Sequence, residues 1–202
     1  MSGKDWDARY EPPGYRYGTE PNEFLREVAK RIPRGPVLCL ADGEGRNGVH
    51  LAGLRHHVLS VDFSRTALGK ARRLAAANRV GLATLVADLE AFEIAPGAWS
   101  GIVSIWAHTP PETRRRIHRA AVAGLAPGGA FVLEAYTPGQ LARGTGGPPD
   151  AARMMTLAGL REELAGLELV IGRELVRRID EGELHHGESE VVQVLAFKPA
   201  TG

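Results

Sequence analysis

A glycine-rich segment and the carboxylate that follows it are the residues of this chain best suited to hold a nucleoside. The segment Gly43-Glu44-Gly45-Arg46-Asn47-Gly48 has the spacing G-x-G-x-x-G. It lies between an apolar run and a segment with helical spacing, the context in which such a loop binds a nucleotide. Asp62 ends the next apolar run, close to the separation at which a carboxylate reaches ribose hydroxyls. These residues predict a nucleoside-binding site; the alternative is a tight turn in which Asp62 only caps a helix.

The charge of this loop distinguishes between kinds of nucleoside. A dinucleotide places its pyrophosphate on such a loop, where backbone N–H groups and the helix dipole favour an anion. Asp42 and Glu44 would repel a pyrophosphate, whereas they suit a cationic ligand. S-adenosylmethionine (SAM) carries a sulfonium and an ammonium group and no phosphate. The sequence therefore predicts SAM as the cofactor, and a nicotinamide-dependent oxidoreductase is the less favoured interpretation.

The elements that would position these residues are strands and helices in alternation. Apolar runs without helical period predict five buried strands, at residues 36–41, 57–64, 83–89, 100–108 and 130–136. Helical spacing follows the first two runs, and Ser64 is the expected N-cap of the second helix. Strands and helices in tandem favour a parallel sheet.

A third helix is predicted after the fourth strand. Thr109-Pro110-Pro111-Glu112 has the spacing of a capping box with proline at the first helical position. The pattern therefore predicts a helix that begins at Pro110 with Thr109 as its cap. It would run to about Leu125 and stop at the Pro-Gly-Gly turn 127–129.

The C-terminal part combines a long loop with a hairpin. Residues 137–155 are rich in glycine and proline and longer than an ordinary connection, which is typical of functional or disordered loops. A last helix is expected at 156–164. Two strand-like runs, 167–179 and 188–199, then predict an antiparallel hairpin.

Composition and charge limit the class of protein. The 202 residues, 44% of them hydrophobic, suffice for one globular domain, and a net charge of +1 argues against a dedicated nucleic-acid or membrane-surface binder. Cys39 is the single cysteine and lies inside an apolar run, so we expect it to be buried and inert. The first residues lack the apolar segment of a secretory signal, and no stretch is long enough for a membrane helix. We expect a cytoplasmic protein of undetermined oligomeric state.

Several segments, in this order, resemble one family. VLCLADGEGRNGVHLA is similar to the first motif of the class I SAM-dependent methyltransferases, VDFS to their ribose motif, ADL to their adenine motif and LAPGGAFVLEAY to the segment after strand four. WDARY and YGTEPN resemble the N-terminal cover of the tellurite-resistance branch, which belongs with the thiopurine methyltransferase-like proteins that act on small molecules. The resemblance implies a single-domain Rossmann-like methyltransferase fold. Its sheet would be seven-stranded and mostly parallel, with a C-terminal antiparallel hairpin and helices on both faces.

The resemblance also implies what the site residues do. The residues expected to bind the cofactor are Asp42, Gly43, Glu44, Gly45, Arg46, Asn47, Asp62, Phe63, Ser64, Asp88, Leu89 and Trp106. Asp62 would accept both ribose hydroxyls, Phe63 and Leu89 would pack against the adenine, and Asp88 would accept from its amino group.

Two residues depart from the family pattern in the first motif. Cys39 stands where the family usually has an acidic residue, and Ala41 where it usually has a glycine. We expect Asp42 and Glu44 to take over the polar contacts near the methionine end of the cofactor. The same departures keep open a second hypothesis, a SAM-binding or nucleoside-binding module without catalysis.

The acceptor is expected at the open end of the sheet, beside Trp106, His108 and Tyr136. Residues 1–20 are rich in aromatic side chains and predict a lid over a domain formed by 21–202, with Tyr10 and Tyr17 contacting the acceptor. His108 follows the fourth strand and is the candidate catalytic residue, as a neutral imidazole; the alternative is a structural residue that packs at the start of the helix. His185-His186 has no further ligands at metal-binding spacing, so no metal site is expected. The partner would be a small-molecule acceptor of unspecified identity.

Overall fold

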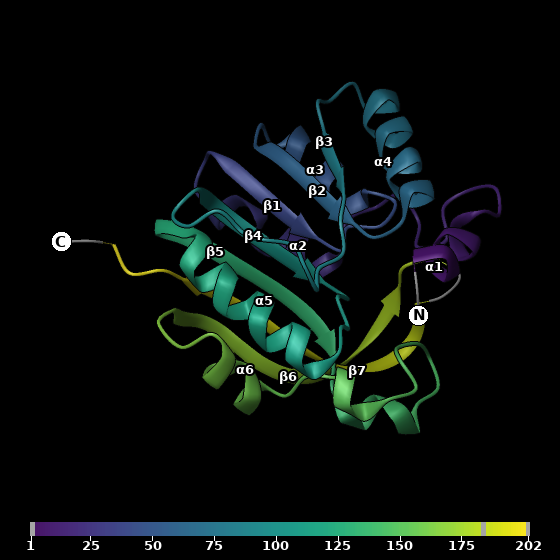
Figure 1. The fold of residues 1–202 in the computed structure, drawn as a ribbon. Coiled ribbons are helices and arrows are strands. Elements are labelled where there is room, and N and C mark those ends of the chain that lie inside the picture. The colour runs from purple at the N-terminus through teal and green to yellow at the C-terminus, as the bar shows by residue number, and fades with distance from the viewer. Residues whose placement is uncertain (1–2, 183–184, 201–202) are drawn as a thin grey trace.

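Seven strands form one sheet in the order β3-β2-β1-β4-β5-β7-β6, in the computed structural model of residues 3–182 and 185–200 (Figure 1). The strands are β1 (Pro36–Leu40), β2 (His57–Asp62), β3 (Ala83–Val86), β4 (Trp99–Ile105), β5 (Leu125–Tyr136), β6 (Glu168–Asp180) and β7 (His186–Phe197). Strands β1 to β5 pair in parallel, whereas β7 lies between β5 and β6 and is antiparallel to both. The predicted fold class and the C-terminal hairpin are confirmed.

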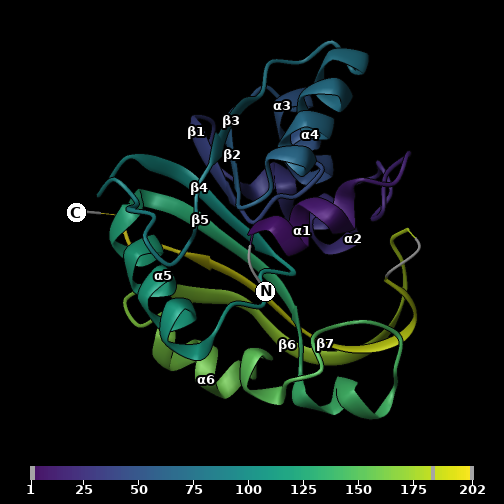
Figure 2. The same ribbon diagram turned by 45° about the vertical axis from the view of Figure 1, so that its right-hand side comes forward.

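Helices cover both faces of this sheet. They are α1 (Gly3–Tyr10), α2 (Glu23–Val28), α3 (Arg46–Gly53), α4 (Arg65–Ala77), α5 (Pro111–Gly124) and α6 (Leu157–Glu163), with short 3-10 turns η1 (Ala29–Arg31), η2 (Pro138–Ala142) and η3 (Ala151–Arg153). Figure 2 shows α5 and α6 on one side of the sheet and α2, α3 and α4 on the other. Within the described residues, no helix is long and apolar enough to cross a membrane.

The side chains of β1 alternate between the two faces of the sheet, which explains why helices cover both faces. Leu38 and Leu40 point into the core under α5 and α6, while Val37 and Cys39 point to the opposite face under α2 and α3. All four side chains are at most 2% exposed. The strand is therefore buried on both sides, as its unbroken apolar run predicts. Cys39 belongs to this core, and burial raises the pKa of its thiol, which keeps it inert.

The strand order reverses direction at β1, and this places the candidate site. From β1 the chain crosses to β2 on one side, and β4 later pairs with the other side of β1. The loops after β1 and β4 therefore diverge and leave a crevice at the carboxyl ends of these strands, where open α/β sheets bind ligands. In Figure 1, α1 lies on the side to which the arrowheads of β1, β4 and β5 point.

The structure corrects the predicted start of α5. Thr109 is not the cap: the N-cap is Pro110, with φ −53° and ψ 149°, and no side chain caps the helix. Pro110 precedes Pro111, and the ring of a proline pushes the residue before it out of the helical region. The helix therefore begins one residue later, with Pro111 in its first turn.

Several predicted strand boundaries also differ, among them the ends of β2 at Asp62 and of β4 at Ile105, before the predicted ends at 64 and 108. β3 ends at Val86, before the predicted end of the 83–89 run. β5 begins at Leu125, ahead of the Pro-Gly-Gly turn, and its pairing with β4 shifts register between Trp99 and Gly101. Gly129 accommodates this irregularity, since a Cβ atom there would lie 2.9 Å from the carbonyl oxygen of Trp99.

Candidate nucleoside and acceptor site

The turn after β1 requires glycine. Gly45 is the N-cap of α3 and has φ +84°, a left-handed conformation that side chains disfavour. A Cβ atom at this position would lie 2.5 Å from the Cβ of Ala71 on α4. Gly43 also has positive φ, +55°. The loop therefore packs its backbone directly against its neighbours, and its amides lie at the crevice.

Asp62 lies at the carboxyl end of β2, beside this turn. Its Oδ2 accepts from the backbone N–H of Gly43 at 2.8 Å and its Oδ1 from that of Ser64 at 2.8 Å. Burial raises the pKa of Asp62, while these two N–H donors oppose that rise. Each carboxylate oxygen keeps a second lone pair, so Asp62 can also accept hydroxyl groups of a ligand.

Asp42 lies beneath the loop rather than on its open side. Its Oδ2 accepts from the Ser60 hydroxyl at 2.5 Å, and its Oδ1 from the backbone N–H of Gly48, the third residue of α3, at 3.3 Å. Burial raises the pKa of Asp42 to about 7, with Ser60 and Gly48 acting in the opposite direction. The chain thus places its own carboxylate at the start of α3, where a dinucleotide would place a phosphate.

Glu44 is paired within the protein as well. Its Oε1 lies 3.0 Å from Lys70 Nζ, and its Oε2 accepts from the backbone N–H of Tyr17 at 3.3 Å. Lys70 Nζ also donates to the carbonyl oxygens of Pro12 and Gly14, at 2.8 and 2.7 Å. Protein groups use both carboxylates, so Asp42 and Glu44 hold the loop and the N-terminal segment, and their contact with the methionine end of the cofactor stays a prediction.

The N-terminal segment contacts the cofactor side of the sheet at two further places. Asp7 Oδ1 accepts from the Ser64 hydroxyl at 2.5 Å and from the backbone N–H of Thr66 at 3.0 Å. A Cβ atom at Gly43 would lie 2.9 Å from Tyr10 Oη. Burial, followed by the negative charge of Asp62, raises the pKa of the Tyr10 phenol. Tyr10 thus lies over the glycine turn and close to Asp62.

The residues expected at the adenine lie in different surroundings. Phe63 is half-buried next to Asp62, where a ring can contact a ligand. Asp88 is exposed, and its Oδ1 accepts from the backbone N–H of Glu90 at 2.8 Å, so it also holds the turn after β3. Leu89 is 7% exposed and packs in the core under α5. The Leu89 side chain therefore supports the turn after β3 from the core side. Only its small exposed part could contact an adenine ring.

Five rings, here called the aromatic cluster, gather at the carboxyl ends of β4 and β5: Tyr17, Trp106, His108, Tyr136 and His185. The Trp106 and Tyr136 rings stack with centroids 4.5 Å apart, and His185 lies 4.7 Å from Tyr17. Burial lowers the pKa of His185 to about 3. Its Nδ1 has no hydrogen-bond partner among the described residues. The cluster is therefore uncharged near neutral pH, and it brings Tyr17, Trp106, His108 and Tyr136 together as expected.

Both ring nitrogens of His108 are used by the backbone. Nε2 accepts from the N–H of Tyr136 at 3.0 Å, which leaves Nδ1 to donate to the carbonyl of Trp106 at 3.1 Å. Burial lowers the pKa of His108 to about 4, so the ring is neutral near pH 7. Because its lone pair faces a backbone N–H, the geometry favours the structural alternative over proton transfer.

We expect His108→Ala to reduce stability more than ligand binding. The change leaves the N–H of Tyr136 and the carbonyl of Trp106 without partners and opens a gap in the aromatic cluster, which costs about 2–4 kcal/mol. Urea denaturation measures the loss, and calorimetry with S-adenosylhomocysteine (SAH) should give nearly unchanged affinity. Full stability combined with a methylation rate reduced about 10- to 1000-fold would instead identify His108 as a catalytic residue.

A buried charge network that the sequence does not reveal joins this cluster to the glycine loop. Glu134 on β5 is fully buried and accepts from Arg177 Nε at 2.8 Å and from Gln193 Nε2 at 2.7 Å. Glu181, just after β6, lies 2.5 Å from Arg46 Nη2. The donors and acceptors are 43 to 135 residues apart in the chain, so no local pattern could have paired them.

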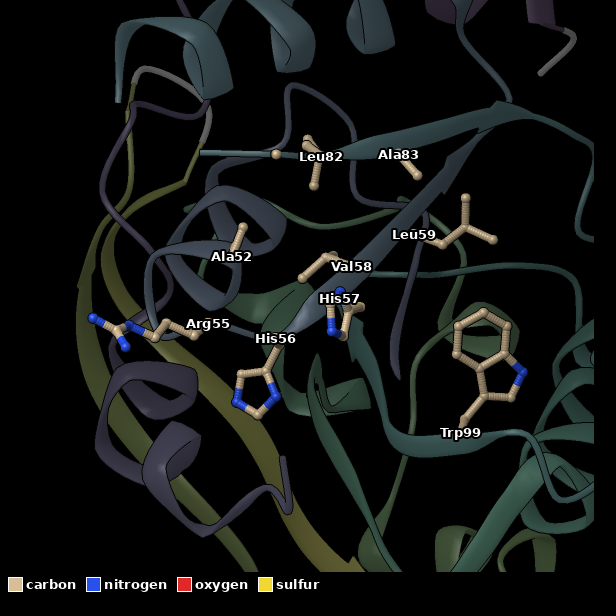
Figure 3. Close-up of a pocket in the computed structure, with 10 residues that line it drawn as sticks. Ala52, Arg55, His56, His57, Val58, Leu59, Leu82, Ala83 and Trp99 are labelled. Atoms are coloured by element: carbon tan, nitrogen blue, oxygen red, sulfur yellow. The ribbon is translucent and has the colours of Figure 1, made fainter. Parts of the chain in front are cut away.

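A groove of about 660 Å³ lies at the other end of the sheet. Its walls include His57, Ala83 and Trp99, the first residues of β2, β3 and β4. Figure 3 shows Arg55, His56 and His57 beside it. Because Asp62 ends β2 at the carboxyl side, this groove is separate from the nucleoside site.

Comparison with known proteins agrees with this geometry. Residues 37–129, which include the glycine turn, Asp62 and β4, match the family model described as a methyltransferase domain. Among curated protein sequences, none matches the chain significantly. The matched residues contain the candidate nucleoside site and lie within the seven-stranded sheet described above.

Solved structures share the fold at low sequence identity. One solved structure comes from work on the conversion of a disulfide bond into a thioacetal group during echinomycin biosynthesis. It is 18% identical, with a TM-score of 0.78 over 99% of this chain and 93% of that one. TehB from Haemophilus influenzae is 18% identical, with a TM-score of 0.72 over 96% of this chain and 65% of that one. The N-methyltransferase NodS from Bradyrhizobium japonicum, in complex with SAH, is 15% identical, with a TM-score of 0.68 over 97% of each chain.

Proposed function

We propose that this protein is a SAM-dependent methyltransferase that acts on a small molecule. The observation that carries the proposal is the pairing of Asp62 with the glycine turn, next to a helix start where Asp42 accepts from the backbone N–H of Gly48. Asp62 offers acceptors for two ribose hydroxyls, as a nucleoside requires. A phosphate at this helix start would compete with Asp42 for that N–H group, which argues against a nicotinamide dinucleotide. The match of residues 37–129 to the methyltransferase domain supports the same conclusion.

The residues present fit SAM at its nucleoside end. Gly43 has positive φ and would meet only Tyr10 Oη closely, so its open side can accommodate a ligand when that phenol moves. Asp62 would hold the ribose, and Phe63 and Asp88 would flank the adenine. When bound, SAM supplies a methyl group on a sulfonium and becomes SAH by in-line displacement. The protein aligns the two reactants and excludes water.

The acceptor is proposed to lie against the aromatic cluster. Trp106 of this cluster directly follows β4, and β4 lies on the other side of β1 from β2, which ends in Asp62. Aromatic walls and neutral imidazoles favour a small acceptor with an apolar part over a highly charged polymer. A polarisable nucleophile such as a thiol or a reduced chalcogen would need little base catalysis, which agrees with the bonded state of His108. The proposed tellurite-resistance branch rests on the WDARY and YGTEPN segments of the sequence.

Binding and turnover together test this function. A thermal-shift series with SAM, SAH and reduced nicotinamide dinucleotide should raise the melting temperature for the first two only, by mass action. Incubation of SAM with thiols, selenite under reducing conditions and amines should then release SAH with one of these acceptors. Binding without turnover would favour the non-catalytic module, because one fold hosts several functions. Stabilisation by the dinucleotide alone would favour the oxidoreductase.

We propose that residues 1–20 act as a lid over the site of a domain formed by residues 21–202. The contacts of Asp7 with Ser64, of Tyr10 with the glycine turn and of Tyr17 with Glu44 support this role. Lys70 fastens it, because one ammonium group joins Glu44 to two carbonyl oxygens of the segment. SAM must displace Tyr10 to enter, so opening of the lid precedes binding.

Lys70→Met is expected to loosen the lid. The variant leaves Glu44 buried without its ion pair and frees the carbonyls of Pro12 and Gly14. Hydrogen exchange in residues 10–17 should become about tenfold faster or more, while exchange in β4 and β5 changes less. Lys30→Met, at an exposed lysine of η1, is the matched control and should leave exchange unchanged. Equal exchange in both variants would rule out the fastening role.

A further inference from the structure

Glu181 joins the cofactor loop to the aromatic cluster through a single oxygen atom. Its Oε2 accepts from Arg46 Nη2 at 2.5 Å and from Trp106 Nε1 at 2.7 Å. Its Oε1 accepts from Asn22 Nδ2 at 2.8 Å and from Arg177 Nη2 at 3.3 Å. The side chain is only 4% exposed. One buried carboxylate thus receives four donors, from the cap of α2, the start of α3, the end of β4 and β6.

The charge balance keeps this carboxylate ionised. Burial alone would raise the pKa of Glu181, but the charge and hydrogen bond of Arg46, together with Trp106 and Arg177, hold it below its usual value. Arg177 also pairs with Glu134 and with the exposed Glu23, so the two arginines balance the two buried acids. Removing one member leaves the others buried with unbalanced charge.

Trp106 depends on such support because its backbone is strained. It has φ +60°, a conformation that costs a residue with a side chain about 1–2 kcal/mol. Its N–H donates to the carbonyl of Glu134 at 2.9 Å, and its indole stacks on Tyr136. Glu181 is the hydrogen-bond acceptor of the indole. Strain of this kind persists only where the surroundings fix it, and it gathers at functional sites.

We propose that Glu181 is a positioning residue that holds Trp106 in place as a wall of the acceptor site. How firmly it holds the indole depends on whether the cofactor occupies the glycine loop. The proposal rests on the proposed function. Arg46 directly follows Gly45, so a ligand on the glycine turn would contact the loop that carries this guanidinium. The carboxylate of bound SAM or SAH would then compete with Glu181 as an acceptor for Arg46. When Arg46 shares its donors with that carboxylate, Glu181 Oε2 becomes a stronger acceptor for the Trp106 indole, since the two donors share one oxygen.

The coupling makes the acceptor site complete only when the cofactor is present. By thermodynamic linkage, an acceptor that binds better when Trp106 is held in place also raises the affinity of the glycine loop for the cofactor. Glu181 therefore orders the two binding events without touching either reactant.

The indole N–H resonances of the wild-type protein test this inference without a substitution. In a titration with SAH, the Trp106 indole N–H should move downfield and exchange more slowly with water. Trp99 is the internal control, because its Nε1 has no partner in the described part of the chain and it lies at the opposite end of the sheet. Loss of one resonance in Trp106→Phe assigns the signal. An unchanged Trp106 resonance at saturating SAH would overturn the inference.

A pair of acid-to-amide variants separates positioning from mere stability. Glu181→Gln should weaken SAH binding about five- to tenfold and abolish the SAH-dependent change at Trp106. Glu163→Gln is the matched control, since Glu163 is also a mostly buried acid that binds an arginine, Arg114, and a histidine, His118, but between α5 and α6. It should lose stability yet keep both SAH responses. If Glu181→Gln retains the Trp106 response, or if Glu163→Gln loses it, the link through Glu181 is refuted.

The failure of this inference differs from the failure of the proposed function. If calorimetry detects no SAH binding to the wild-type protein, the proposed function fails, and the inference with it. If SAH binds while Trp106 stays unaffected, methyl transfer remains the proposal and only the coupling is lost.

Discussion

Asp62→Ala is expected to weaken the binding of SAM and SAH by about 1–3 kcal/mol, which is about 5- to 150-fold in affinity. The variant removes the acceptor proposed for the ribose hydroxyls, so a bound ligand would bury them without partners. It also removes the acceptor of the Gly43 and Ser64 N–H groups, so the glycine turn becomes less fixed. Isothermal calorimetry of the folded variant measures the loss.

Two further variants isolate the role of Asp62. Asp62→Asn keeps one acceptor oxygen and should give an intermediate affinity. Asp150→Ala removes an acid whose side chain caps η3 and does not bind the glycine turn, and should bind SAH as the wild type does. Circular dichroism checks that each variant is folded. Unchanged affinity in folded Asp62→Ala would remove the ribose assignment.

Asp42→Asn is expected to stabilise the protein above neutral pH. The native pKa of Asp42 is about 7, above that of the unfolded chain, near 3.8. The native state therefore binds more protons between these values, and the contribution of Asp42 to stability is lost as the pH rises from about 4 to about 7. Asparagine carries no charge to bury. The difference between variant and wild type should grow from near zero at pH 4 to about 2–4 kcal/mol at pH 8.

Comparing the two proteins at each pH cancels the other groups that titrate in this range. His108 and His185 have lowered pKa values and add an opposite trend to both proteins equally. Ser60→Ala tests the cause further, because it removes a hydrogen bond that favours the ionised form of Asp42. We expect it to destabilise the protein more at pH 8 than at pH 5. Parallel stability curves for Asp42→Asn and the wild type would contradict the assignment.

Local chemistry accounts for the parts of the fold that could be predicted from the sequence. The apolar run of β1 and the glycine spacing of the loop depend on neighbours in the chain, and so does the Ser64 cap, which accepts from the backbone N–H of Ala67 at 3.0 Å. The predicted cap at Thr109 was wrong because two sequence patterns compete there. The capping box favours a helix that begins at Pro110, but Pro111 keeps Pro110 out of the helical region, and this effect is the stronger.

The candidate site was predictable only where segments close together in the sequence form it. Asp62 and the glycine turn follow from two adjacent strand ends. Glu181 carries no such signal, since its partner Arg46 is 135 residues away and it follows an ordinary strand. Lys70 lies in the middle of a helix and reads as a surface residue until the lid covers it, leaving it 5% exposed. The charges of Asp42 and Glu44 were visible in the sequence, but their partners were not.

The position of β7 has a consequence for synthesis on the ribosome. β7 leaves the exit tunnel after the other six strands of this sheet, yet it is an interior strand, between β5 and β6. Until residues 186–197 emerge, β5 and β6 each present an unpaired edge, and Glu134 lacks its partner Gln193. A nascent chain at this stage can pair its edges with another chain, as exposed strands do. Emergence of residues 186–197 thus decides between a complete sheet and aggregation.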